Sequence, residues 1–342
     1  MKSFSFIGRA CLGGALLAAS AGADAAMTLY GRIDTDIEYQ RGPRGNAAQM
    51  VDNASRWGMR GNEDLGGSLR ADFGLEQGFQ ADNGTATNPQ FRNAFVGLSG
   101  VFGAFALGRL DSATSVGSPI YSQITQNVDF VIHDAGATAI GTKVLNARNR
   151  VSNALGYATP DFGGFSLRAR INLAGPDPAT PNASSPVKEE DDFRQYDTGL
   201  NYASGNFSAG LGYSRDAKTG GLVANDFRDK MQATAAYDFK FVNVYGVYGR
   251  DRYVGTASSR TDVRYWLAGF TVPYGAHSLT VNYMERDVQN STSGRLRKAQ
   301  AGYGYRLSKR TMPYVFFDYE DGNSRKPGDT VVTYGIGIQH KF

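Results

Sequence analysis

Two eleven-residue stretches, one near each end of the chain, alternate strictly between apolar or small residues and polar ones. In residues 29–39 one set is Leu29, Gly31, Ile33, Thr35, Ile37 and Tyr39, and the other is Tyr30, Arg32, Asp34, Asp36 and Glu38. Residues 332–342 repeat the pattern, with Thr333, Gly335, Gly337, Gln339 and Lys341 on the polar side. Because successive side chains of a strand point to opposite faces, each stretch predicts a strand with one apolar and one polar face. Two terminal strands can pair with each other, so a sheet could close without an open edge.

Fourteen further strand candidates lie between these two. Polar connections rich in Gly, Pro, Asn and Asp separate many of them. The total of sixteen is even, as in bacterial outer-membrane barrels. The fold class predicted is therefore all-β, a 16-stranded antiparallel transmembrane β-barrel. The candidates are residues 50–64, 66–81, 91–99, 102–110, 150–158, 164–174, 193–204, 205–216, 228–238, 240–251, 262–273, 276–288, 296–307 and 309–321.

The composition agrees with strands that face lipid on one side and water on the other. The chain of 342 residues contains 43 Gly, 19 Tyr and 20 Phe, yet its mean hydropathy is only −0.36. No apolar run reaches the roughly 20 residues that a spanning helix needs. The formal charge of +4 is mild, so the balance does not indicate a nucleic-acid partner.

The first 25 residues have the pattern of an export signal. Lys2 and Arg9 give a positive start, residues 10–19 are apolar, and Ala23-Asp24-Ala25 fits a cleavage site. The domains expected are thus a signal peptide over residues 1–25 and one barrel domain over residues 26–342. The only cysteine, Cys11, lies in the signal segment, so the mature chain is expected to have no disulfide and no thiolate metal site.

The connections between the strand candidates alternate between short turns and long polar loops, the first of which is expected over residues 41–49. Such an asymmetry is typical of barrels with short periplasmic turns and long external loops. The longest connection, about residues 111–149, has no two-residue rhythm. A gap of that length within a dense strand pattern indicates a functional loop. We expect it to fold into the lumen and narrow it.

Six motifs, taken in order, resemble the trimeric general-diffusion porins of Gram-negative outer membranes, in their beta-proteobacterial form. The resemblance covers essentially the whole mature chain and implies a homotrimer of 16-stranded barrels with the third external loop folded into each pore. It also implies outer-membrane lipid and lipopolysaccharide as surroundings, and recognition of the terminal Phe342 by the outer-membrane insertion machinery. The motifs are Leu29–Arg32, Ser55–Gly61, Arg92–Ser99, Phe102–Arg109, Val151–Tyr157 with Pro160–Phe165, and Gly337–Phe342.

Arginines on the polar faces of the strands are the candidate site. Strand parity places Arg32, Arg56, Arg92 and Arg150 opposite apolar neighbours, hence inward, and by resemblance these four sit where the family keeps the basic cluster of its constriction. Grouped guanidiniums in a narrow passage attract anions and repel cations. Further pore-lining candidates are Arg60, Arg109 and Arg148, with rim salt bridges as the alternative for Arg60 and Arg148. The acidic residues of the constriction loop are Asp111, Asp129 and Asp134.

An enzyme is disfavoured because no catalytic cluster is apparent. The histidines, His133, His277 and His340, lie in different segments, so neither a catalytic site nor a metal site is expected, and no cofactor is implied. The function predicted is passive diffusion of small hydrophilic solutes, anionic or neutral, with anions preferred. The alternatives are a porin selective for one anion, such as phosphate or an organic acid, and a barrel acting as an adhesin, which would carry larger external loops.

Overall fold

The computed structural model describes residues 26–111, 116–131, 140, 144–146, 150–173, 193–218, 221–255, 262–289, 295–321 and 330–342. The expected signal segment 1–25 lies outside these residues, as do Asp134, Arg148 and His133. Within the described part, no helix is both long and apolar enough to cross a bilayer.

In the residues that the structure describes, seventeen strand segments form one antiparallel sheet, and β1 pairs with β17 to close it. Two of the segments, β2 and β3, share one position in the wall, so the closed barrel has 16 strands. The predicted fold class is confirmed. The strands are β1 (Ala26–Gly42), β2 (Gly45–Asp52), β3 (Arg56–Gly66), β4 (Leu69–Phe79), β5 (Ala86–Gly100), β6 (Gly103–Leu110), β7 (Val151–Ala158), β8 (Phe165–Asn172), β9 (Phe193–Ser204), β10 (Phe207–Lys218), β11 (Phe227–Asp238), β12 (Asn243–Tyr253), β13 (Asp262–Tyr274), β14 (His277–Gln289), β15 (Arg295–Tyr305), β16 (Thr311–Asp321) and β17 (Thr330–Lys341).

The shared position results from a break in the second strand of the chain. The C-terminal part of β1, Thr35–Gly42, pairs with β2, and its N-terminal part, Ala26–Arg32, pairs with β3. Residues 53–55 separate the two segments, and Ala54 there has a left-handed backbone with φ of 59°. The sequence predicted one uninterrupted strand over 50–64 and a long loop over 41–49, and both predictions are wrong in detail. The loop is instead a tight hairpin, because β1 runs to Gly42 and β2 starts at Gly45.

The exposure of side chains is the reverse of that in a soluble protein. On β1 the apolar Leu29, Ile33 and Ile37 are 64%, 44% and 57% exposed, whereas Asp34 and Asp36 between them are 1% and 2% exposed. Apolar side chains therefore cover the outside and polar ones face the lumen, as a barrel in lipid requires.

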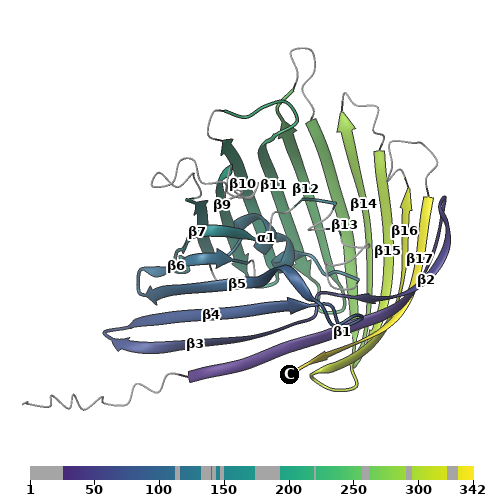
Figure 1. Cartoon of the computed structure of the whole chain (residues 1–342), viewed down its shortest axis with the longest axis horizontal. Helices are drawn as coiled ribbons and strands as arrows, with labels where there is room; N and C mark the ends of the chain where they lie inside the picture. The colour runs from purple at the N-terminus through teal and green to yellow at the C-terminus, as the bar shows by residue number, and fades with distance from the viewer. Residues whose placement is uncertain are drawn as a thin grey trace, which may run out of the picture.

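One helix, α1 (Pro119–Asn127), lies within the 111–149 connection and packs against the lumen face of the barrel wall (Figure 1). It begins at Ser118, whose hydroxyl caps the helix by accepting from the backbone N–H of Tyr121. Its buried Ile120 and Ile124 belong to a cluster that includes Tyr265 and Leu267 of β13. The loop thus buries its own apolar face against the wall, as predicted for a loop folded inward.

Glycines in the wall make room for this helix. A Cβ atom at Gly212 would come within 2.5 Å of Ile120, and one at Gly199 within 2.8 Å of Gln123. The Gln123 amide donates to the carbonyls of Leu200 (3.3 Å) and Leu211 (2.8 Å). The helix can therefore approach the strand backbone closely and bond to it.

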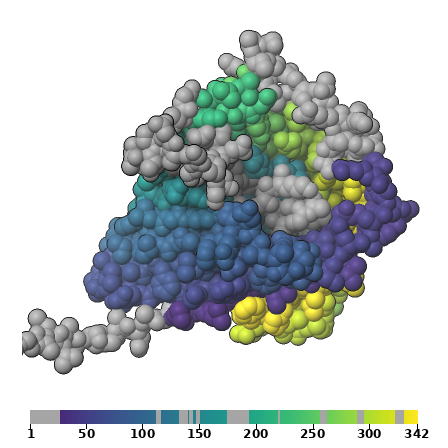
Figure 2. Space-filling model, in the orientation of Figure 1, coloured from purple at the N-terminus to yellow at the C-terminus, as the bar shows by residue number. Residues whose placement is uncertain are grey.

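Figure 1 shows the front and far walls of the barrel from opposite faces, so the common tilt of the strands looks different on the two walls. Strands β3–β6 cross the front of the molecule at a strong tilt, and β10–β16 stand upright behind them (Figure 1). In the space-filling view the blue front wall ends well below the green top of the far wall (Figure 2). The polar residues discussed below line the inner side of the front wall.

Candidate functional site

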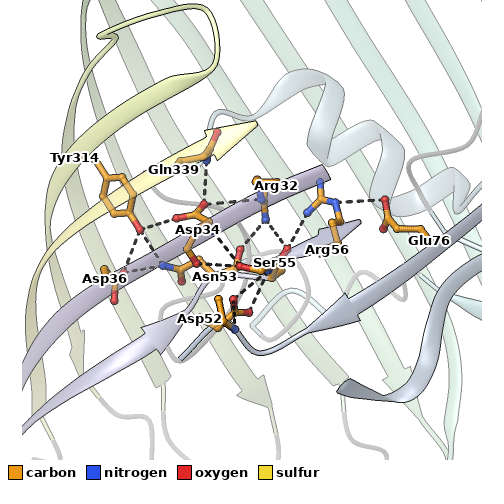
Figure 3. A network of polar contacts seen from close by, with 12 residues as sticks. Arg32, Asp34, Asp36, Asp52, Asn53, Ser55, Arg56, Glu76, Tyr314 and Gln339 are labelled. Atoms are coloured by element: carbon orange, nitrogen blue, oxygen red, sulfur yellow. Dashed lines mark hydrogen bonds and ion pairs between the residues drawn. The ribbon is translucent and has the colours of Figure 1, made fainter. Parts of the chain in front are cut away.

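Two arginines meet at the strand break. Arg32 on β1 and Arg56 at the start of β3 are direct cross-strand partners. Like charges in this position repel each other, and the break supplies carbonyls to hold them. Nη2 of Arg32 donates to the carbonyls of Asn53 (2.6 Å) and Ala54 (3.1 Å), and Nη1 of Arg56 donates to the Ala54 carbonyl (3.1 Å; Figure 3). Carbonyls position the guanidiniums without cancelling their charge.

The break itself is stabilised by a buried polar network. The Ser55 hydroxyl accepts from the backbone N–H of Asp34 (3.0 Å), and the carboxylate of Asp52 accepts from the Ser55 N–H (3.1 Å). The Asn53 amide donates to Asp36 (2.7 Å; Figure 3). These bonds replace the ladder bonds that the break removes, so that the Asn53 and Ala54 carbonyls can face the arginines.

From Arg56 the charges continue along the inner wall as a line. Nε of Arg56 is 3.4 Å from Glu76 on β4, and Nε of Arg92 on β5 is 2.7 Å from the same carboxylate. Asp111 follows, 3.7 Å from Nη2 of Arg92 and 2.7 Å from Nε of Arg150. We call Arg32, Arg56, Arg92 and Arg150 the arginine line. The structure brings all four predicted arginines together, with two carboxylates interleaved.

The arginine line remains in part accessible. The side chains of Arg56 and Arg150 are 25% and 26% exposed, and that of Arg92 is 14% exposed, whereas Glu76 and Asp111 are each only 3% exposed. Within the line, the guanidiniums of Arg56, Arg92 and Arg150 therefore present more charge to the lumen than the two carboxylates do, whereas Arg32 is only 6% exposed. A solute passing this wall meets N–H donors and positive charge.

The parity argument for Arg92 was wrong, although its side chain joins the line. Strict alternation would put Arg92 opposite Asn93 and Phe95, with Phe95 facing lipid. Instead Phe95 packs inward against a cluster that contains Leu110 and Val116. The register shifts between Glu76 and Gln77, and Arg92 is the extra residue of a bulge. A bulge leaves one residue unpaired and resets the alternation, so residues on both sides of it reach the lumen.

The same effect occurs around Arg150. The sequence placed Val151 on the lipid side, but Val151 is 8% exposed and packs with Leu110 and Val116. A register shift follows Gly108, and Asn153 has a left-handed backbone with φ of 51°. Arg109, next to that shift, donates to the Ser152 hydroxyl. Here too the local irregularity of the strand pairing, and not the two-residue alternation, decides which face of the sheet each side chain takes.

The remaining predicted residues lie elsewhere. Arg60 lies outside the arginine line, with its guanidinium 5.2 Å from the centre of the Tyr30 ring. Asp111 was expected to face the arginines from the loop, yet it lies among them. Asp129 is held at the far wall, where its carbonyl accepts from Tyr245 (2.9 Å) and Asn282 (3.0 Å). Phe342 pairs with Gly31 of β1 through two backbone bonds, of 3.0 and 3.1 Å.

The sequence analysis did not identify two charged residues that lie beside the arginines, Glu76 and Lys341. Glu76 joins Arg56 to Arg92, but parity alone gives the face of a residue and not its neighbours along the barrel. Lys341 is the cross-strand partner of Arg32 and is exposed; its place on the polar face of residues 332–342 could have identified it. In the described part of the chain, no group of three His, Cys, Asp or Glu side chains is arranged to hold a metal ion.

A closed 16-stranded barrel with an apolar exterior, an internal loop and a charged lumen is the architecture of an outer-membrane diffusion channel. The family model for Gram-negative porins matches residues 10–325. The chain therefore belongs to the Gram-negative porin family and is an outer-membrane porin, a channel and not an enzyme.

Relatives of known name agree with this family. The outer membrane porin protein 32 of Delftia acidovorans is 28% identical, over 96% of this chain and 98% of that protein. The major outer membrane protein P.IB of Neisseria meningitidis is 26% identical, over 96% and 97%. Among solved structures, the anion-selective porin from Comamonas acidovorans superposes with a TM-score of 0.71 at 24% identity, covering 93% of this chain and all of that one. The OmpT protein of Vibrio cholerae, solved in a trimer form, gives a TM-score of 0.68 at 14% identity.

Proposed function

We propose that this porin lets small hydrophilic solutes diffuse across the outer membrane with a preference for anions, and that the arginine line forms the selective wall of its constriction. The observation that carries the proposal is the convergence of four guanidiniums from β1, β3, β5 and the residue preceding β7 on one side of the lumen. Arginine keeps its charge at any physiological pH, so the preference does not depend on protonation.

The charge balance of this wall supports the sign of the preference. The two carboxylates interleaved with the line are buried beneath it, and each is shared by two arginines. The approaching ion therefore meets more positive than negative charge. A relative with 24% identity is described as anion-selective, which is in keeping with this sign.

The loop that holds α1 would set the size limit. Asn127 donates to Thr234 (2.8 Å), and Gln232 donates to the carbonyl of Ile120 (3.2 Å), so the loop is held against β11. With the loop fixed to one side of the lumen and the arginines on the other, solutes would pass between them. We further propose a homotrimer, as in the trimer form of the Vibrio cholerae protein.

Reversal potentials in a planar bilayer under a KCl gradient test the proposal. The wild-type channel should give an anion-favouring sign, and replacing Arg56, Arg92 and Arg150 by Gln, singly and together, should reduce it step by step. A cation-favouring wild-type channel would refute the proposal, as would a sign unaffected by the triple replacement. A current that saturates with one anion would instead identify a substrate-selective porin.

A further inference from the structure

Three arginines surround one carboxylate at the upper ends of β10, β11 and β12 (Figure 1). Asp229 of β11 lies between its two cross-strand partners, Arg215 of β10 and Arg252 of β12. Nε of Arg252 is 2.5 Å from the Asp229 carboxylate, and Nε of Arg228, the extra residue of a bulge, is 3.0 Å from it. We call Arg215, Arg228 and Arg252 the rim arginines. The single carboxylate neutralises only one of their three positive charges.

The strands that carry these residues turn them away from the lumen. Arg215 stands between Ser214 and Asp216, which are 0% and 3% exposed, and Arg252 follows Asp251, which is 1% exposed. The buried polar side chains of this barrel face the lumen, and successive side chains of a strand take opposite faces. Arg215 and Arg252 therefore point outward.

The cations of the cluster are accessible, whereas the carboxylate is not. The side chains of Arg228 and Arg252 are 36% and 33% exposed, and that of Asp229 is 5% exposed. Arg215 is also exposed, and it makes no ion pair with any residue that the structure describes. An anion that approaches from outside thus meets guanidinium groups and not the carboxylate beneath them.

A cavity of about 500 Å³ opens beside two of the rim arginines. Arg215, Arg228 and Lys218 line it, together with the buried Asp216. Its volume is in the usual range of small-molecule sites, roughly 300–1,000 Å³. Guanidinium groups donate paired N–H bonds to phosphate, and a phosphate monoester has a charge of about −1.5 to −2 and three acceptor oxygens. The cavity therefore offers the charge and the donors that a phosphate monoester requires.

Exposed aromatic residues place the rim arginines relative to the bilayer. Tyr248 on the outward face of β12 is 58% exposed and lies four residues before Arg252, about 13 Å at the usual rise per residue. Its cross-strand partner on β13, Trp266, is 39% exposed. Outward tyrosines and tryptophans of this kind mark the headgroup level, and the long connections mark this end of the strands as external. The rim arginines thus lie where headgroups of the outer leaflet reach them.

We propose that the rim arginines, with Lys218, bind a phosphate group on the sugar headgroup of a phosphorylated glycolipid in the outer leaflet. A bound phosphate relieves the repulsion among cations that have only Asp229 in common. A lipid is favoured over a free phosphate ion because the site faces outward at headgroup level, where the bilayer holds the lipid beside it. The inference goes beyond the proposed function, since these arginines face away from the lumen.

Titration of a glycolipid into detergent micelles that contain the folded channel tests the site. The probes are lipid A with its two sugar phosphates and the same lipid without phosphates, and native mass spectrometry measures the bound fraction. We expect the phosphorylated lipid to bind at least tenfold more tightly. Arg215→Gln and Arg228→Gln should each weaken its binding about tenfold, which corresponds to about 1.4 kcal/mol, and leave the binding of the lipid without phosphates unchanged.

Arg297→Gln is the matched control. Arg297 also lies on the outward face, in the cross-strand row of Trp266, and its side chain is 47% exposed, but it is paired with Glu285. Its replacement should leave the affinity unchanged. Because Arg215 makes no ion pair among the described residues, Arg215→Gln leaves the pairs of the wall intact, and the variant should fold like the wild type.

Three results would overturn the assignment. The first is an unchanged affinity for the phosphorylated lipid in folded Arg215→Gln and Arg228→Gln channels. The second is an equal loss in Arg297→Gln, because the lipid would then respond to any outward cation. The third concerns the source of the phosphate: inorganic phosphate at the same concentration should not displace the lipid. If it does, the site takes a soluble anion and not a glycolipid.

Discussion

The cationic side chains on the two sides of the lumen differ in how they are paired with carboxylates and in how far they are exposed. On the side of β1 and β3–β7, Arg56, Arg92 and Arg150 share two interleaved carboxylates and keep between 14% and 26% of the side chain exposed, and Arg32 is bonded to the carbonyls at the strand break. On the far side each buried cation has a carboxylate of its own. Arg170 pairs with Asp197, Lys230 with Asp251 and Lys298 with Asp318 and Glu320, and these cations are 0–1% exposed.

The difference follows from hydration. A charge that is removed from water must be paired and hydrogen-bonded, or its desolvation is not offset. A charge that keeps part of its water can share a carboxylate with a second cation, and its exposed N–H groups can still act on a passing solute. The far-side pairs therefore have a structural task, whereas the arginine line keeps the exposed charge on which the proposed anion preference rests.

Lys230 shows that structural task directly. Its ammonium group donates to Asp251, to the Tyr265 hydroxyl (2.7 Å) and to the carbonyl of Leu145 (2.8 Å). Leu145 belongs to the connection that carries α1, so one buried cation joins the internal loop to β11, β12 and β13. The far side of the barrel therefore holds the internal loop in place, and the arginine line lies on the opposite side of the lumen.

The largest expected effect comes from breaking this far-side anchor. Lys230→Met leaves Asp251 buried without its cation, which should cost about 3–5 kcal/mol of stability. Urea titration of the refolded protein in detergent micelles measures the loss, and single-channel recordings should show larger current fluctuations because the Leu145 contact is gone.

Two further variants sharpen this test. Adding Asp251→Leu to Lys230→Met should restore much of the stability, since it also removes the buried carboxylate that the Lys230 ammonium had neutralised. Lys240→Gln, in an exposed pair with Asp238 at a short turn, should leave the unfolding midpoint unchanged. A Lys230→Met channel as stable as the wild type would contradict the structural role of the far-side pairs.

A smaller effect is expected from the near side. Glu76→Gln removes the carboxylate shared by Arg56 and Arg92, so the anion-to-cation permeability ratio should rise about two- to threefold in 0.1 M KCl. The increase should shrink in 1 M KCl, where the Debye length falls from about 10 to 3 Å. Reversal potentials at both salt concentrations measure this.

The matched control is Glu285→Gln, which removes a carboxylate paired with Arg295 and Arg297 at the far end of β14 and β15. It should not change the ratio. If Glu76→Gln lowered the anion preference, or if the change were equally large in concentrated salt, the interleaved carboxylates would not be reducing the positive charge that the arginine line presents to ions.

Much of the barrel could be predicted because alternation is a local property. The alternation of apolar and polar residues is visible within residues 29–39 and within residues 332–342 alone. The structure has β1 and β17 at these positions, as the pattern predicted. The strand break could not be predicted, since Asp52, Asn53 and Ser55 are polar residues that either a strand or a loop accepts. The break exists because tertiary bonds to Asp34 and Asp36 stabilise it.

The candidate site shows the same limit. Parity gave the face of Arg32 and Arg56 from their own strand, but Arg92 reaches the lumen through a bulge that no two-residue pattern contains. The partners Glu76 and Asp111 lie 16 and 19 residues from Arg92 in the chain, on β4 and just after β6. Which residues stand at the same height of the barrel is set by strand register, and register is a property of the assembled sheet.

The smallest expected effect tests how closely the far side holds the loop. In Gly212→Ala the added Cβ would lie 2.5 Å from Cδ1 of Ile120 and 2.7 Å from the side-chain oxygen of Gln123, so α1 must move away from the wall and toward the arginine line. Overpacking of this kind costs about 1–3 kcal/mol, and the single-channel conductance should fall modestly while the anion preference stays. Gly246→Ala, where the nearest atom would be 3.4 Å away, should change neither quantity. An unchanged conductance in Gly212→Ala would mean that α1 does not border the passage, and the size limit would then have to come from another part of the lumen.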